Sequence, residues 1–152
     1  MADVKLPMEG TCRCGQVRFR ITAPPLATAA CHCTGCQRMS SSAFSLTAII
    51  PSAGFSVIQG EPVEGGLQGG ETHHYFCPHC KSWMFTRAEG MDEFVNIRPT
   101  MLEDPAALSR PFIETYASEK LPWAVTGAKH SFDTFPPMEA FGPLIAEYAA
   151  QS

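Results

Sequence analysis

Seven cysteines stand in three tight groups within the first 80 residues, and none follows the third group. The groups are Cys12 and Cys14; Cys31, Cys33 and Cys36; and Cys77 and Cys80. An odd number of closely spaced thiols is awkward for disulfide pairing but suits metal binding, because seven divides into a set of four and a set of three. The sequence therefore predicts two zinc ions per chain with different roles.

The set of four, Cys12, Cys14, Cys77 and Cys80, is expected to form a structural site. Side chains at positions i and i+2 of a strand point to the same face, so Cys12 and Cys14 can bind one ion together. The Cys77-Pro78-His79-Cys80 turn presents a second pair. Two such pairs complete the tetrahedral four-thiolate set of a structural zinc, and thiolates favour zinc over magnesium, calcium or manganese.

The set of three, Cys31, Cys33 and Cys36, has no fourth cysteine to complete it. Three protein ligands, with water or substrate in the fourth position, are typical of catalytic zinc. Three thiolates would leave a net charge of about −1 on a zinc site, which makes the ion a weak Lewis acid. A better role is to accept an external thiol, lower its pKa and present it as a nucleophile.

Three other interpretations of the cysteines remain open. A disulfide framework would leave one cysteine unpaired and needs an oxidising compartment. A redox pair at Cys77 and Cys80 would need a thioredoxin-like strand–helix–strand setting, which the sequence does not suggest. Alternatively, both zinc sites are structural and a histidine closes the second one. The last case describes a non-catalytic, zinc-stabilised binding module.

The histidines are weighed individually as ligands for that case. His32 lies between two ligands and should point to the opposite side of an extended segment, so we expect it to support a ligand or to lie at the surface. His73 and His74 are adjacent in a predicted strand, so only one of them can face the metal region. His79 and His130 are expected not to bind metal.

The elements that must position these cysteines are mostly strands. Period-two alternation, β-branched residues and flanking Pro or Gly predict strands at 16–22, 26–30, 43–50, 55–59, 72–76, 82–87, 93–98 and 112–117. Residues 34–40 can make only a short helical turn, and the glycine-rich segment 60–71 is expected to be a surface loop. Apolar spacing from Met138 to Tyr148 predicts a tail helix that Gly142 and Pro143 interrupt.

Composition restricts the partners and the location. A chain of 152 residues with 45% apolar residues can form one ordinary domain with a real core. The net charge of −4, with dispersed Lys and Arg, argues against a nucleic-acid partner. The chain begins without a signal-peptide pattern and has no apolar run long enough for a membrane span, so a cytoplasmic location is expected. The oligomeric state cannot be inferred from these features.

Two further groups of residues are candidates for binding or packing. Arg38 and the Ser40-Ser41-Ser42 run follow the three-cysteine set and could bind the carboxylate of a peptide-like thiol, although an ordinary solvated turn is the simpler interpretation. Trp83 and Trp123 are expected in the core rather than at a ligand.

Three ordered segments resemble the glutathione-dependent formaldehyde-activating enzyme family, also called the CENP-V/GFA domain. The segments are Gly10-Thr11-Cys12-Arg13-Cys14-Gly15-Gln16-Val17-Arg18-Phe19, Cys31-His32-Cys33-Thr34-Gly35-Cys36-Gln37-Arg38 and Phe76-Cys77-Pro78-His79-Cys80. The resemblance spans about residues 8–125, which we take as one zinc-binding domain with residues 126–152 as a tail packed on it. Lys81 departs from the pattern, since a glycine usually follows the third segment in the family.

The resemblance implies a mainly β, Mss4-like zinc-bound fold with few short helices. It assigns Cys12, Cys14, Cys77 and Cys80 to a structural zinc and Cys31, Cys33 and Cys36 to a catalytic zinc. The implied activity is that of a carbon-sulfur lyase, an S-hydroxymethylglutathione synthase-like enzyme that joins glutathione to formaldehyde reversibly. The expected partners are therefore a small thiol and a small aldehyde.

Overall fold

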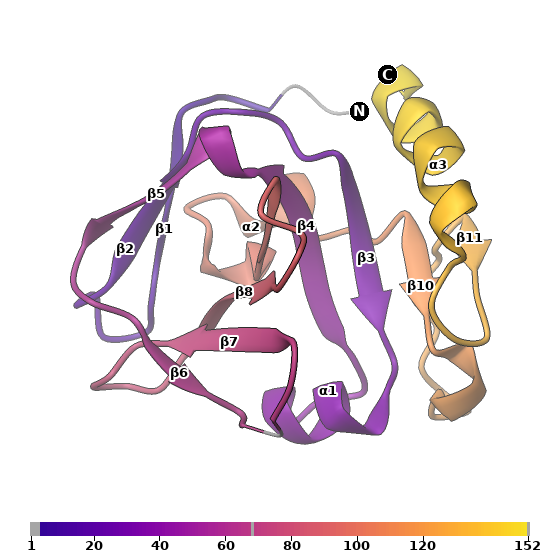
Figure 1. The fold of residues 1–152 in the computed structure, drawn as a ribbon, viewed down its shortest axis with the longest axis horizontal. Helices are drawn as coiled ribbons and strands as arrows, with labels where there is room; N and C mark the ends of the chain where they lie inside the picture. The colour runs from indigo at the N-terminus through magenta and orange to yellow at the C-terminus, as the bar shows by residue number, and fades with distance from the viewer. Residues whose placement is uncertain (1–3, 68, 152) are drawn as a thin grey trace.

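The computed structural model describes residues 4–67 and 69–151 as a mainly β protein with few helices (Figure 1). Met1–Asp3, Gln68 and Ser152, which belong to the predicted N-terminal segment, glycine-rich loop and tail, lie outside the described residues. Within the described residues, no helix has both the length and the hydrophobicity needed to cross a membrane. The prediction of a mainly β fold with few helices is confirmed.

The strands form two sheets. The smaller sheet has the order β1-β2-β5 and is antiparallel, with bounds Met8–Thr11, Arg18–Ile21 and Phe55–Gln59. The larger sheet has the order β11-β10-β3-β4-β9-β8-β7-β6. Its strands, in that order, span His130–Ser131, Ile113–Thr115, Ala27–Cys31, Ser45–Pro51, Phe94–Ile97, Trp83–Ala88, Thr72–Phe76 and Val63–Gly65. Strand β10 pairs in parallel with β3 and β11, and the other pairs of this sheet are antiparallel.

The described chain also contains three α-helices and three short 3₁₀ turns. Helix α1 spans Thr34–Ser40, α2 spans Pro105–Leu108 and α3 spans Met138–Ala150, and the 3₁₀ turns are Ser52–Gly54, Pro99–Met101 and Ala117–Glu119. Helix α1 confirms the predicted short turn after the second cysteine group. The short helix α2 and the strands β1 and β11 were not predicted.

The main core is formed by residues of both sheets and includes the apolar face of the first predicted strand, 16–22. Val17, Phe19 and Ile21 are buried there together with Met84 and Ile97. Residues 18–21 alternate between half-exposed and buried positions, because one face of the strand packs its apolar side chains into the core. The alternation therefore identified a real strand, and Cys12 and Cys14 lie in the turn that precedes it.

A second cluster holds helix α3 against the edge of the larger sheet. Leu144 and Tyr148 are buried with Ala27, Phe112 and Ile113, and the helix lies at the end of the larger sheet formed by β3, β10 and β11 (Figure 1). The helix continues through Gly142 and Pro143, which are both exposed, so the predicted interruption is wrong. Tertiary packing of one helix face outweighs the local cost of the missing proline N–H. The division at residue 125 stays a prediction.

The glycine-rich segment 60–71 contains strand β6, where only a loop was predicted. Strand β6 pairs antiparallel with β7, and its Gly65 packs against Phe76 so closely that a Cβ would lie 2.6 Å from the ring. Glycine is needed here for a close backbone approach, which explains a composition that resembles a loop.

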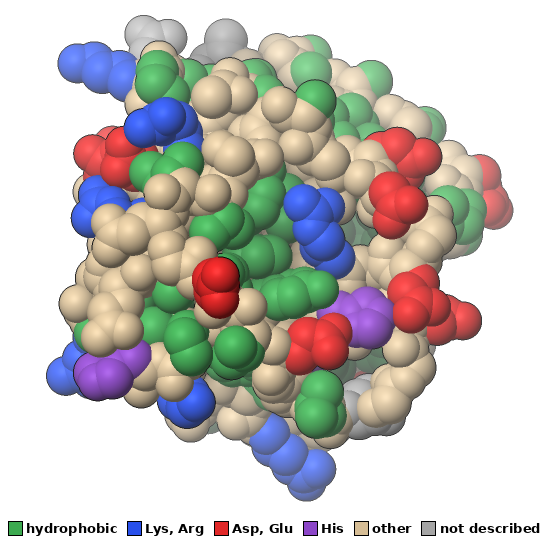
Figure 2. Space-filling view, turned by 60° about the vertical axis from the view of Figure 1, so that its left-hand side comes forward, with side chains coloured by type: hydrophobic (Ala, Val, Ile, Leu, Met, Phe, Trp, Pro, Cys, Tyr) green, Lys and Arg blue, Asp and Glu red, His purple; other side chains and the backbone are tan. Residues whose placement is uncertain are grey.

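On the same side of the molecule, Phe55, Val57, Tyr75 and Phe85 line an apolar hollow of about 340 Å³ (Figure 2).

Candidate metal centres and the adjoining cavities

The set of four cysteines comes from two turns that belong to different sheets. Cys12 and Cys14 lie between β1 and β2, and Cys77 and Cys80 lie between β7 and β8. All four sulfur atoms lie within 4.8 Å of one another, with Cys12 Sγ 3.6 Å from Cys14 Sγ and Cys14 Sγ 3.7 Å from Cys77 Sγ. The fold thus brings together two pairs that are more than 60 residues apart.

These distances fit one tetrahedral metal ion. Zinc–sulfur bonds of about 2.3 Å at tetrahedral angles place the sulfur atoms about 3.8 Å apart. A disulfide would need sulfur atoms about 2.0 Å apart, and all seven cysteines are free. Backbone N–H groups also point at the sulfurs, with Val17 N donating to Cys12 Sγ at 3.3 Å and Cys80 N to Cys77 Sγ at 3.4 Å. Burial opposes ionisation of Cys12, but the Val17 N–H and the neighbouring thiols outweigh it and lower the pKa of Cys12, which favours the thiolate that binds metal.

Each turn of this set is followed by a residue in the left-handed conformation. Gly15 has φ +84° and donates its N–H to Cys12 O at 3.2 Å, and Lys81 has φ +64° and donates to Cys77 O at 3.0 Å. Lys81 therefore adopts the geometry that glycine allows at this position, despite its side chain. The departure from the family pattern leaves the shape of the turn intact.

The set of three cysteines lies where strand β3 passes into helix α1. Cys31 ends β3, Cys33 is the N-cap of α1, and Cys36 lies in its first turn. Cys33 Sγ accepts the N–H of Cys36 at 3.3 Å, as capping side chains do. The three sulfur atoms lie within 4.8 Å of one another, and no described histidine, aspartate or glutamate belongs to the set.

The three thiols differ in acidity. The pKa of Cys31 is lowered to about 5, mainly by a hydrogen bond from Cys36 and also by one from the Thr115 hydroxyl. Burial acts in the opposite direction. The same hydrogen bond to Cys31 and burial raise the pKa of Cys36, and burial raises the pKa of Cys33. Cys31 is thus the thiolate of the set near neutral pH, and a bound metal ion would displace the protons of the other two.

The segment that carries this set is attached to residues far along the chain. His32 is fully buried, and its Nε2 lies 2.8 Å from Glu114 Oε1 on β10. The backbone N–H of Thr34 donates to Glu119 Oε1 at 2.9 Å, and Gln37 Nε2 donates to Glu119 O at 3.1 Å. Of the two predicted placements of His32, the one at the surface is therefore wrong. Its contact with Glu114 holds the backbone between Cys31 and Cys33 in place.

A cavity of about 300 Å³ opens onto Cys31 and Cys36. We call it the cysteine cavity; His74, Arg98 and Tyr116 also line it. Of the two adjacent histidines, His73 contacts Glu64 and Glu89, whereas His74 lines the cavity and lies 2.9 Å from the Thr86 hydroxyl. Burial lowers the pKa of His74, and the positive charge of Arg98 lowers it further, so its imidazole is neutral near pH 7.

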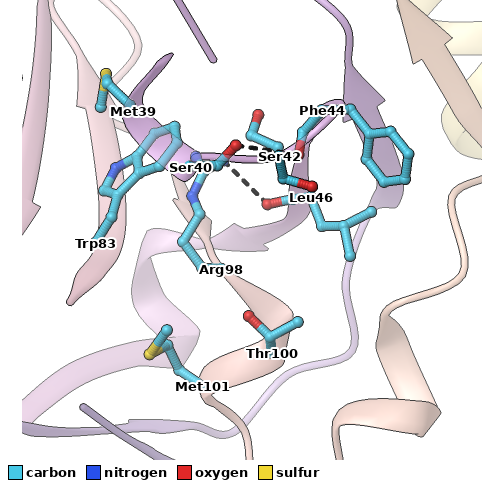
Figure 3. Close-up of a pocket in the computed structure, with 10 residues that line it drawn as sticks. Met39, Ser40, Ser42, Phe44, Leu46, Trp83, Arg98, Thr100 and Met101 are labelled. Carbon is cyan, nitrogen blue, oxygen red and sulfur yellow. Dashed lines mark hydrogen bonds between the residues drawn. The ribbon is translucent and has the colours of Figure 1, made fainter. Parts of the chain in front are cut away.

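A second cavity, of about 330 Å³, adjoins the first (Figure 3). We call it the serine cavity, because Ser40, Ser42 and Ser45 line it together with Thr100. Ser45, Trp83 and Arg98 line both cavities. The guanidinium of Arg98 stacks on the Trp83 ring, 4.0 Å from its centroid, and its Nη1 donates to Leu46 O at 3.0 Å.

The profile of a family described as glutathione-dependent formaldehyde-activating enzyme matches residues 7–119, which carry both cysteine sets and most of both cavities. The chain belongs to this family. A protein of Halomonas elongata, named "Putative glutathione-dependent formaldehyde-activating enzyme", is 33% identical over 89 residues. That match covers 51% of this chain and 55% of the relative, so it spans about half the length of either protein.

A crystal structure of a Rhodobacter sphaeroides protein has a similar fold, with a TM-score of 0.52 and 23% identity. The similarity covers 63% of this chain and 88% of that chain. For a member of the formaldehyde-activating family, two cysteine sets able to bind metal are consistent with zinc. The metal's identity and the number of ions bound stay predictions, as do the roles of the individual ligands.

The structure corrects the predicted place of Trp123, places Arg38 away from both cavities and adds Arg98 to the residues around the sites. Arg38 is exposed and lines neither cavity, whereas Ser40 and Ser42 do line the serine cavity. Trp83 is buried as predicted, but Trp123 is 72% exposed, so its predicted place in the core is wrong. Arg98 was not identified, because an arginine at the end of a predicted strand gives no local signal of burial.

Proposed function

We propose that this member of the formaldehyde-activating family is a zinc-dependent carbon-sulfur lyase that joins glutathione to formaldehyde reversibly. The proposal rests on one observation: the cysteine cavity opens onto the three-thiol set, and Cys31 and Cys36 form part of the cavity wall. Cys31, Cys33 and Cys36 supply one ligand fewer than the four that zinc takes. When bound there, zinc would hold an external thiol and lower its pKa.

The proposed reaction balances without a redox partner. The sulfur of the thiol forms a bond to the carbonyl carbon, the carbonyl π electrons move to oxygen, and the thiol proton ends on that oxygen. The reverse reaction breaks the sulfur–carbon bond and regenerates thiol and aldehyde. His74 lines the cavity with a neutral imidazole and can carry the proton. A reducing compartment such as the cytoplasm suits a chain with seven free cysteines.

The variant Cys33→Ser tests this function. We expect the purified wild-type protein to contain two zinc ions per chain and the variant to contain one, with an unchanged circular dichroism spectrum. The wild type should accelerate the exchange of ¹³C-formaldehyde between its free and glutathione-bound forms, measured by NMR, and the variant should lose this acceleration. Thr34→Ala, an exposed neighbour in the same turn, should keep both metal and activity. A fully active Cys33→Ser protein would refute the proposed mechanism.

A further inference from the structure

Arg98 is a buried cation without a carboxylate partner. Arg98 is only 7% exposed, and none of the ion pairs between described residues involves it. Nη1 donates to Leu46 O at 3.0 Å, Nη2 donates to the Thr86 hydroxyl at 3.2 Å, and Nε has no hydrogen-bond partner. A buried charge is costly unless it is paired, so the position calls for an anion.

The surroundings of Arg98 are suited to an anion that enters from outside. The guanidinium lies over the Trp83 ring and is fixed by its hydrogen bonds to Leu46 O and Thr86, so its donors are oriented before any ligand arrives (Figure 3). Ser40, Ser42 and Thr100 add hydroxyl groups to the serine cavity. The Ser45 hydroxyl, which lines both cavities, is buried without a hydrogen-bond partner, as is Arg98 Nε. Ser45 and Arg98 both line the two cavities, so these unsatisfied groups belong to the wall that the cavities share.

We propose that the serine cavity is a subsite for a carboxylate of the thiol substrate, and that Arg98 is the residue that binds this carboxylate. The inference rests on the proposed function, and it restricts the substrate class to thiols that carry a carboxylate. Arginine presents parallel donors that match the two oxygens of a carboxylate, and exclusion of water strengthens the pair. Because Arg98 also lines the cysteine cavity, a bound carboxylate and a thiol near Cys36 can belong to one small molecule.

The competing role for Arg98 is to balance the charge of the cysteine set. Burial lowers the pKa of Arg98 to about 10, whereas negative charge on Cys36 and Cys31 opposes that shift, so the thiolates act on the guanidinium. If this were the purpose of Arg98, its loss would weaken metal binding and affect every thiol equally. If Arg98 binds a carboxylate, its loss would discriminate between thiols with and without one.

Arg98→Gln separates these roles with three small molecules. S-methylglutathione carries the carboxylates but no free thiol, and cysteamine is a thiol without a carboxylate. We expect calorimetry to show S-methylglutathione binding that is about tenfold or more weaker in the variant than in the wild type. The KM for glutathione should rise by a similar factor, while the KM for cysteamine and the metal content stay unchanged. Arg38→Gln removes an exposed arginine of helix α1 and should change none of these values.

The other outcomes are equally informative. Equal losses for glutathione and cysteamine, or a lower metal content in Arg98→Gln, would overturn the proposal in favour of charge balance. Turnover of glutathione with an unchanged KM in Arg98→Gln would overturn the subsite and leave the proposed function standing. Absence of turnover in the wild type, together with Arg98-dependent binding of S-methylglutathione, would overturn the function and support the subsite.

Ser42→Asp provides the test if Arg98→Gln does not fold. Ser42 is exposed at the serine cavity, so the substitution adds a carboxylate to the cavity without disturbing the core. This carboxylate should compete for Arg98 and weaken binding of S-methylglutathione by about tenfold or more. Ser41→Asp, which adds the same charge at an exposed neighbour that lines neither cavity, should bind it as the wild type does. Unaltered binding by Ser42→Asp would overturn the proposal.

Discussion

Single residues set the local geometry of the candidate metal turns. Gly15 and Lys81 follow the two cysteine pairs of the four-thiol set, and both have positive φ. A residue with a Cβ pays on the order of 1 kcal/mol for this conformation, whereas glycine does not. Lys81 is therefore kept at a cost to stability, and its N–H bond to Cys77 O shows that the turn nevertheless closes.

Lys81→Gly should stabilise the protein. We expect the free energy of unfolding, measured by denaturant titration of the metal-loaded protein, to rise by up to about 1 kcal/mol, because glycine removes the strain. Lys81→Ala keeps a Cβ and should give no such gain, and Gly15→Ala should lose a similar amount. A gain of equal size in Lys81→Ala would show that the side chain, rather than the backbone, is responsible.

At the scale of elements, the structure places glycine in two different roles. Gly10 on β1 lies beneath the ring of Phe19, its partner on β2, and a Cβ at position 10 would lie 2.4 Å from Cζ of that ring. Gly142 lies on the exposed side of α3, where nothing comes within 4 Å of an added Cβ. The first glycine is required by packing, and the second only weakens a helix.

Alanine substitutions at these two glycines should have opposite effects. Gly142→Ala should raise the free energy of unfolding by about 0.5–1 kcal/mol, because alanine has the higher helix propensity and reduces the entropy of the unfolded chain. Gly10→Ala should lower it by about 1–3 kcal/mol, because the fully buried Phe19 must move. Thermal denaturation of both variants at equal metal content measures the difference. Destabilisation by Gly142→Ala would mean that α3 is limited by something other than propensity.

At the scale of the whole molecule, the four-thiol set connects the two sheets. One pair lies in the β1–β2 turn of the smaller sheet, and the other lies in the β7–β8 turn of the larger sheet. A metal ion that joins Cys14 to Cys77 closes a loop of more than 60 residues. By the chain-entropy estimate for cross-links, such a closure contributes on the order of 4 kcal/mol to folding.

The two cysteine sets should therefore differ in their effect on stability. Cys77→Ser should lower the midpoint of thermal unfolding far more than Cys33→Ser, because only the first variant opens the connection between the sheets. A strong chelator added to the wild type should reproduce the loss seen in Cys77→Ser, and zinc should restore the midpoint. Metal content measured on the same samples is the control. Equal midpoints for the two variants would contradict a structural role for the four-thiol set.

Much of this protein can be inferred from local patterns. Cysteine spacing grouped the candidate ligands as the structure does, since both sets come together in space. Alternation and turn residues located most of the strands and the short helix α1, because burial of one strand face imposes period two on neighbouring positions. The order of three cysteine segments was enough to indicate the family.

Features that depend on contacts between segments distant in the sequence could not be predicted from these local patterns. Strand β6 exists because β7 offers an edge and Phe76 admits Gly65, and α3 persists through Pro143 because Leu144 and Tyr148 pack on the sheet. Arg98 became a candidate binding residue only when Trp83 and the serine cavity were seen around it. Ligand type and periodicity are properties of adjacent residues, whereas burial and cavities arise from contacts between distant ones, and only the folded chain specifies those contacts.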